Sequence, residues 1–127
     1  MMTARQTAVR YAGTFHGEPG QVGRVRDGLR AYLDDCPRAD DAVLIASELS
    51  ANAVLHSASR GESFTVQAEV LRDGILIEVE DLGGPWLRRS QEDGHRGLAI
   101  VTALSSGWGI ETSGGCRVTW ARVSFHG

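Results

Sequence analysis

The chain has 127 residues, with 13 Lys or Arg side chains, 16 acidic side chains and a formal net charge of −3. All 13 are arginine, and a chain without lysine cannot hold a P-loop lysine, a pyridoxal Schiff base or a lysine general base. The mild acidity argues against binding of a nucleic-acid backbone, which requires clustered basic side chains. The length allows one domain.

The two cysteines, Cys36 and Cys116, lack the spacing of a metal or redox motif, so we expect reduced, partly buried thiols. The residues before Arg10 contain no apolar stretch typical of a secretion signal. No apolar run approaches the roughly 20 residues that span a membrane. We therefore expect a cytoplasmic protein, with residues 1–9 as a flexible tail and residues 10–127 as a single domain.

The first half of the chain predicts one strand and two helices. Residues 10–15 form a short edge strand. Residues 21–35 carry apolar side chains at helical spacing, which indicates an amphipathic helix that Pro37 ends. Residues 42–57 are rich in Ala and Leu and predict a second, more buried helix, preceded by acidic residues that suit a helix N-terminus.

The second half predicts strands in hairpins. Four strands are expected, at residues 64–71, 75–80, 107–112 and 117–125. The Asp73-Gly74 pair predicts a tight hairpin, and residues 113–115 join the last two strands. Residues 82–93 form an irregular segment typical of a lid, and residues 98–104 form a short helix. This order predicts an α+β fold, a two-layer sandwich with a mostly antiparallel sheet and helices on one face.

Three polar residues interrupt the second helix at steps of four: Glu48, Asn52 and His56. This spacing places them along one stripe. The apolar surface around them is supplied by Val43, Ile45, Leu49, Val54 and Leu55. Burying a carboxylate and an amide is costly unless they meet a ligand, a metal or partners. The alternative is that the stripe simply faces solvent.

Two glycine-containing clusters follow. An aspartate at the end of a strand, Asp81, precedes Gly83; its carboxylate can accept a hydrogen bond from an exocyclic amine, and glycine lets the backbone approach a flat ring. The segment GHRGL at 94–98 precedes a helix and exposes backbone N–H groups to an anion. Each cluster also has an ordinary interpretation as a turn.

Taken together, the clusters resemble the N, G1 and G2 boxes of the GHKL (Bergerat-fold) ATPase/kinase superfamily. The matching segments are ASELSANAVLHS at 46–57, VEDLGGPW at 79–86, and GHRGLAIVTALSSGWGIE at 94–111, which continues into GGCRVTWARV at 114–123. Within the superfamily, the chain is most similar to SpoIIAB/RsbW-type anti-sigma-factor serine/threonine kinases and their actinobacterial relatives. The resemblance extends back to Phe15 and implies the Bergerat, histidine-kinase-like fold.

The resemblance also implies roles for individual residues. Asn52 would ligate Mg²⁺, and Glu48 would be the catalytic carboxylate that takes or orients the proton of an attacking hydroxyl. Asp81 would bind the adenine amine, Gly83 would let the ring lie against the backbone, and His56 would support the pocket.

The phosphates of ATP would lie against the last box, formed by Gly94, Arg96, Gly97 and Leu98. Mg²⁺, backbone N–H groups and arginine can neutralise the charge of a transferring phosphoryl group without a lysine.

The resemblance therefore implies an Mg-ATP-dependent anti-sigma factor and protein serine/threonine kinase. Its partners would be a sigma factor and a STAS-domain anti-anti-sigma protein, without direct contact to nucleic acid or membrane. Relatives are often homodimers.

The sequence has three alternative interpretations. The first is a non-catalytic ATP-binding module that switches protein partners, which the displaced glycine at Gly84-Pro85 and the short lid allow. A sensor histidine kinase catalytic domain is a weaker alternative, because we expect no room for a dimerisation helix pair. A metallohydrolase is disfavoured, since no His/Asp cluster has ligand spacing.

Overall fold

The structure is a computed structural model that describes residues 10–56, 62–82 and 98–126. The predicted tail at residues 1–9 and nearly all of the predicted irregular segment lie outside the described residues. The same holds for four predicted site residues: Gly83, Gly94, Arg96 and Gly97.

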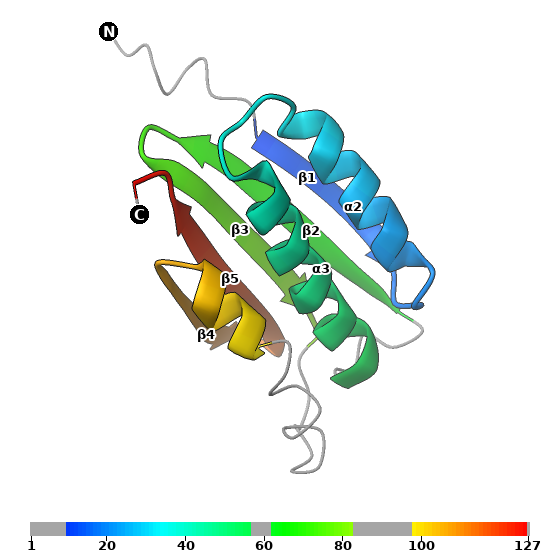
Figure 1. Cartoon of the computed structure of the whole chain (residues 1–127). Coiled ribbons are helices and arrows are strands. Elements are labelled where there is room, and N and C mark those ends of the chain that lie inside the picture. The colour runs from blue at the N-terminus through cyan, green and yellow to red at the C-terminus, as the bar shows by residue number, and fades with distance from the viewer. Residues whose placement is uncertain (1–9, 57–61, 83–97, 127) are drawn as a thin grey trace, which may run out of the picture.

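The described chain forms one sheet covered by helices on one face (Figure 1). Its elements are β1 (Arg10–His16), α2 (Gln21–Tyr32), α3 (Ala39–His56), β2 (Ser63–Leu71), β3 (Gly74–Asp81), β4 (Gly107–Ser113) and β5 (Cys116–Ser124). The strand order is β1-β2-β3-β5-β4, and every neighbouring pair is antiparallel. Residues 98–104 are helical, as predicted. The predicted α+β class and element order are confirmed.

The core lies between the sheet and the helices. The alternation of β3 turns Ile75, Ile77 and Val79 to the covered face, where all three are buried. Helix α3 packs on β2, β3 and β5, and it contributes buried side chains such as Ile45 and Leu49. Helix α3 lies over the centre of the sheet, and its buried face includes Ser47 and Ser50 beside the apolar side chains. Helix α2 covers the β1 side and buries Val25 and Leu29.

The end of α2 and the start of α3 both differ from the prediction. Helix α2 ends at Tyr32, earlier than predicted, because Leu33 leaves the helical region with φ −94° and ψ 18°. Helix α3 begins earlier than predicted, at Ala39. Just before it, Arg38 has a left-handed φ of 59°, and its guanidinium donates to the carbonyl oxygens of Leu104 and Ser124. Arg38 also pairs with Asp41 in the first turn of α3. The local pair and the tertiary bonds together fix the start of α3, and a short stretch of sequence encodes only the local pair.

The β2–β3 hairpin is present, but the prediction that Asp73-Gly74 forms its turn is wrong by one residue. Leu71 pairs with Gly74, so Arg72 and Asp73 form the loop. A Cβ added at Gly74 would meet the carbonyl oxygen of Val123 on β5. The glycine is therefore required by the close approach of the neighbouring strand, and not by the turn.

The β4–β5 turn follows the prediction. Gly114 and Gly115 have φ values of 60° and 86°, a left-handed conformation that glycine adopts without steric cost. Cys36 and Cys116 are free and half-buried, as predicted, and burial raises the pKa of the Cys36 thiol. Among the described helices, none is both long and apolar enough to cross a membrane.

Candidate functional site

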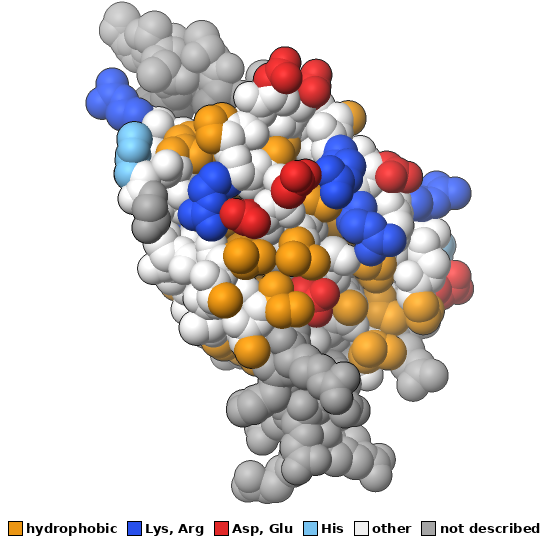
Figure 2. All heavy atoms as spheres, in the orientation of Figure 1, with side chains coloured by type: hydrophobic (Ala, Val, Ile, Leu, Met, Phe, Trp, Pro, Cys, Tyr) orange, Lys and Arg blue, Asp and Glu red, His pale blue; other side chains and the backbone are white. Residues whose placement is uncertain are grey.

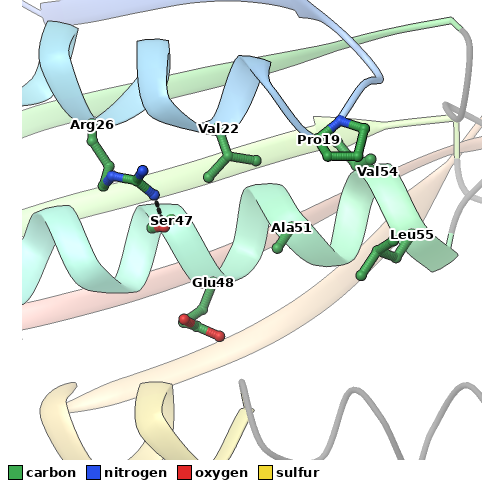
Figure 3. Close-up of a pocket in the computed structure, with 8 residues that line it drawn as sticks. All are labelled: Pro19, Val22, Arg26, Ser47, Glu48, Ala51, Val54 and Leu55. Atoms are coloured by element: carbon green, nitrogen blue, oxygen red, sulfur yellow. Dashed lines mark hydrogen bonds between the residues drawn. The ribbon is translucent and has the colours of Figure 1, made fainter.

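The polar stripe of α3 lies at the edge of the helix's buried face. Glu48 and Asn52 are both half-buried. The stripe is therefore neither fully buried nor fully exposed to solvent. Figure 3 shows the Glu48 side chain pointing away from α2, toward the side of α3 on which residues 98–104 lie. His56 is the last residue of α3, and its side chain lies outside the described part of the chain.

The apolar residues around the stripe divide into two groups. Val43, Ile45, Leu49 and Val54 are buried against the sheet, as predicted. Leu55, which was also predicted to supply apolar surface around the stripe, is 55% exposed. Leu44 is 41% exposed as well, and hydrophobic side chains gather on the helical face of the molecule (Figure 2).

A groove of about 280 Å³ lies between α2 and α3. Its lining residues are Pro19, Val22, Arg26, Ser47, Glu48, Ala51, Val54 and Leu55 (Figure 3). Across it, the Arg26 guanidinium donates a hydrogen bond of 3.0 Å to the Ser47 hydroxyl. The groove lies on the α2 side of α3, so Glu48 is the only predicted site residue among those lining residues.

Asp81 is buried at the carboxyl end of β3. It is the register partner of Arg117 on β5, and strand alternation turns both side chains to the helix-covered face. The Arg117 Nη2 donates to the Asp81 Oδ2 at 3.0 Å, and each side chain is no more than 4% exposed. The Asp81 carboxylate therefore already has a cationic donor.

The energetics favour persistence of the Asp81–Arg117 pair. Removing one member of a buried ion pair costs about 3–5 kcal/mol, because the other charge is left uncompensated. A hydrogen bond from a neutral donor to a charged group contributes a net of about 1.5–3 kcal/mol. An amine such as that of adenine is consequently too weak a donor to displace the guanidinium from Asp81.

Leu98 is the first described residue of the short helix and is half-buried against the core. Val101, one turn later, is fully buried. The helix is also joined to β4, since the Trp108 indole Nε1 donates to the Thr102 hydroxyl at 2.8 Å. These contacts fix the helix on the same side of α3 toward which Glu48 points.

The donor set on α3 fits magnesium with a triphosphate. Among the described residues, no group of three or more His, Cys, Asp or Glu side chains could hold a metal ion. Mg²⁺ requires no such cluster, because it keeps several waters and binds through one or two protein oxygens together with phosphates. The half-buried amide of Asn52 offers one such oxygen, one turn from the carboxylate of Glu48.

The surroundings of Asp81 fit an adenine base less simply, because Arg117 occupies this position. The sequence predictions gave Arg117 no role. Arg117 lies within the quoted segment GGCRVTWARV, and no function was assigned to it. The signal was available in the alternation of that strand, since Arg117 shares the inward parity of Ala121 and Val123. An arginine at an inward position of a core strand calls for a buried acidic partner.

Comparison with solved structures identifies a shared fold. The Acinetobacter baumannii histidine kinase AdeS matches this chain with a TM-score of 0.54 and 17% sequence identity, over 97% of this chain and 72% of that chain. At this identity the likeness concerns the fold, and it confirms the predicted histidine-kinase-like architecture. No protein-family model and no curated protein matches the sequence.

Proposed function

We propose that the protein binds Mg-ATP and acts as a protein serine/threonine kinase of the anti-sigma-factor type. The observation that carries the proposal is the pairing of Glu48 and Asn52, one turn apart and half-buried on α3, within a histidine-kinase-like fold. The sequence boxes described above support the anti-sigma type, which remains a proposal.

The proposed chemistry uses two residues of α3. When bound, Mg-ATP supplies the γ-phosphoryl group, and the metal offsets the charge on its oxygens. Asn52 holds the metal through its amide oxygen. Glu48 accepts the proton of the substrate hydroxyl as that oxygen bonds to phosphorus and the bond to the leaving oxygen of ADP breaks. The helix of residues 98–104, which includes Leu98, closes the phosphate side of the site.

The proposed partners are a STAS-domain anti-anti-sigma protein, which would receive the phosphoryl group on a serine or threonine, and a sigma factor. Phosphorylation would prevent the antagonist from binding, which leaves the kinase bound to the sigma factor. The exposed Leu44 and Leu55 provide apolar surface on α3 that a protein partner could cover.

Replacement of the proposed catalytic carboxylate tests the assignment. In Glu48→Gln, transfer of labelled phosphate from ATP to a panel of STAS-domain proteins should fall by about 10²–10⁴-fold, which is the usual contribution of a general base. The affinity for Mg-ATP, measured by calorimetry, should stay within about threefold of wild type, which corresponds to a change in binding free energy below about 1 kcal/mol.

The matched control is Glu78→Gln, which changes a half-buried carboxylate on β3 that lines a different pocket. It should transfer phosphate at the wild-type rate. If Glu48→Gln also transfers at that rate, Glu48 is not the catalytic base.

A second candidate function is a nucleotide-binding switch without phosphotransfer. The Asp81–Arg117 pair favours this function. Arginine already occupies the carboxylate that would bind the base, and a site altered in this way can bind a nucleotide without transferring its phosphoryl group. The same labelling experiment separates the two functions. A switch would bind Mg-ATP and label no member of the panel.

A further inference from the structure

The base end of the proposed nucleotide site differs from its phosphate end in charge. Among the described residues, Glu48 forms no salt bridge, whereas Asp81 is bonded to Arg117. A lone buried carboxylate is a strong acceptor for an amine. A carboxylate bonded to guanidinium shares its negative charge, and the pair as a whole is neutral.

The position of Arg117 follows from the sheet and not from a flexible loop. Asp81 and Arg117 are directly opposite each other in the β3–β5 ladder, and the next inward pair is Val79 with Thr119. Directly opposed side chains on one face lie within contact distance. Because both residues are nearly completely buried, the guanidinium has no solvated position to which it can move without breaking a charge-assisted bond.

The chemistry of the adenine amine conflicts with this arrangement. The 6-amino group of adenine is a donor, and it needs an acceptor. Arg117 takes Oδ2 of Asp81 and places further N–H donors beside it, since guanidinium carries five donors and no acceptor. A guanidinium–carboxylate bond is charged at both the donor and the acceptor, whereas an amine–carboxylate bond is charged only at the acceptor, so the guanidinium outcompetes the amine.

We propose that Arg117 is a specificity-determining residue that withholds Asp81 from the nucleotide base, so that the site binds nucleoside triphosphates without discriminating for the 6-amino group. This inference rests on the proposed nucleotide site. Affinity then comes from the phosphates, the metal and contacts to the ring faces.

The test compares ATP with purine riboside triphosphate, which is ATP without the 6-amino group. Both are titrated as magnesium complexes into the protein, and the ratio of their Kd values is measured by calorimetry. Wild type should bind the two within about threefold of each other. In Arg117→Met, which releases Asp81 while filling similar space, ATP should bind about tenfold or more tightly than the analogue, as expected for a hydrogen bond to a charged acceptor.

Arg122→Met is the matched control, because Arg122 lies on the same strand and pairs with an aspartate at the opposite end of it. It should keep the wild-type ratio. Circular dichroism verifies that each variant is folded. If Arg117→Met does not fold, Arg117→Gln removes the charge with a smaller change in polarity and should also shift the ratio toward ATP.

Two results would overturn the inference. The first is a wild-type preference for ATP of tenfold or more, which needs no variant to interpret. The second is a folded Arg117→Met that binds both nucleotides equally. If neither nucleotide binds to wild type or to either folded variant, the proposed nucleotide site itself is wrong, and the inference fails with it.

Discussion

Two aspartate–arginine pairs involve β5: one joins it to Asp81 at the end of β3, and the other joins it to Asp73 in the loop before β3. The two pairs differ mainly in burial. At one end, Arg117 contacts Asp81 at 3.0 Å, and both side chains are at most 4% exposed. At the other end, Arg122 contacts Asp73 at 2.9 Å, with side chains 45% and 60% exposed. The geometry is nearly equal, but solvent screens only the second pair. The environment, and not the residue types, decides whether such a pair constrains the protein.

Removal of the buried cation should have the largest effect. Arg117→Met leaves the Asp81 carboxylate uncompensated, so the free energy of unfolding should fall by about 3–5 kcal/mol. Urea unfolding followed by circular dichroism measures this change. A loss below about 1 kcal/mol would mean that the pair is as weak as a surface pair.

Replacement of both buried charges should reverse most of that loss. In Asp81→Leu/Arg117→Met, no charge remains to be desolvated, and buried pairs replaced by apolar residues are often neutral or more stable by about 1–4 kcal/mol. The double variant should therefore be at least about 3 kcal/mol more stable than Arg117→Met in the same urea experiment. If the two variants have equal free energies of unfolding, the unpaired Asp81 carboxylate does not destabilise the folded protein.

At the exposed end, close packing should matter more than charge. Gly74→Ala forces a Cβ against the Val123 carbonyl oxygen, and the strands must separate to accommodate it. We expect a loss of about 1–3 kcal/mol, the usual cost of overpacking. Gly20→Ala is the control, because a Cβ there meets nothing within 4 Å. If both variants unfold at the same urea concentration, the close approach of β5 does not constrain residue 74.

Removal of the exposed cation should have the smallest effect. Arg122→Met should lower the free energy of unfolding by about 0.2–1 kcal/mol, the range for solvent-exposed pairs. Repeating the measurement at about 1 M salt, where the Debye length is about 3 Å, should reduce this difference, while the loss in Arg117→Met should persist. If the loss of unfolding free energy in Arg122→Met does not depend on salt, solvent does not screen the exposed pair, and the two pairs do not differ as proposed.

The fold could be predicted well because its signals are local and periodic. The Asp73-Gly74 pair indicated the β2–β3 hairpin, and helical spacing indicated α2. The misplaced features depend on contacts distant in sequence. The start of α3 depends on Arg38 reaching Ser124, and Gly74 is required by Val123 on another strand. No pattern within a short window contains these contacts.

The candidate site was predicted unevenly for the same reason. The stripe of Glu48 and Asn52 follows from helix geometry, and the structure places both at the edge of the buried face. The pairing of Asp81 with Arg117 depends on the β3–β5 register, which joins residues 36 positions apart. The roles of the residues in the site stay predictions.

Binding of Mg-ATP to the wild-type chain is the most direct measurement. Calorimetry should detect binding in the presence of Mg²⁺, and both chelation of the metal and Asn52→Ala should weaken it by about tenfold or more, corresponding to at least about 1.4 kcal/mol. Gln67→Ala, which removes a carboxamide from β2 at a different pocket, should bind as wild type does. Absence of binding, or binding that depends on neither Mg²⁺ nor Asn52, would contradict a nucleotide site on α3.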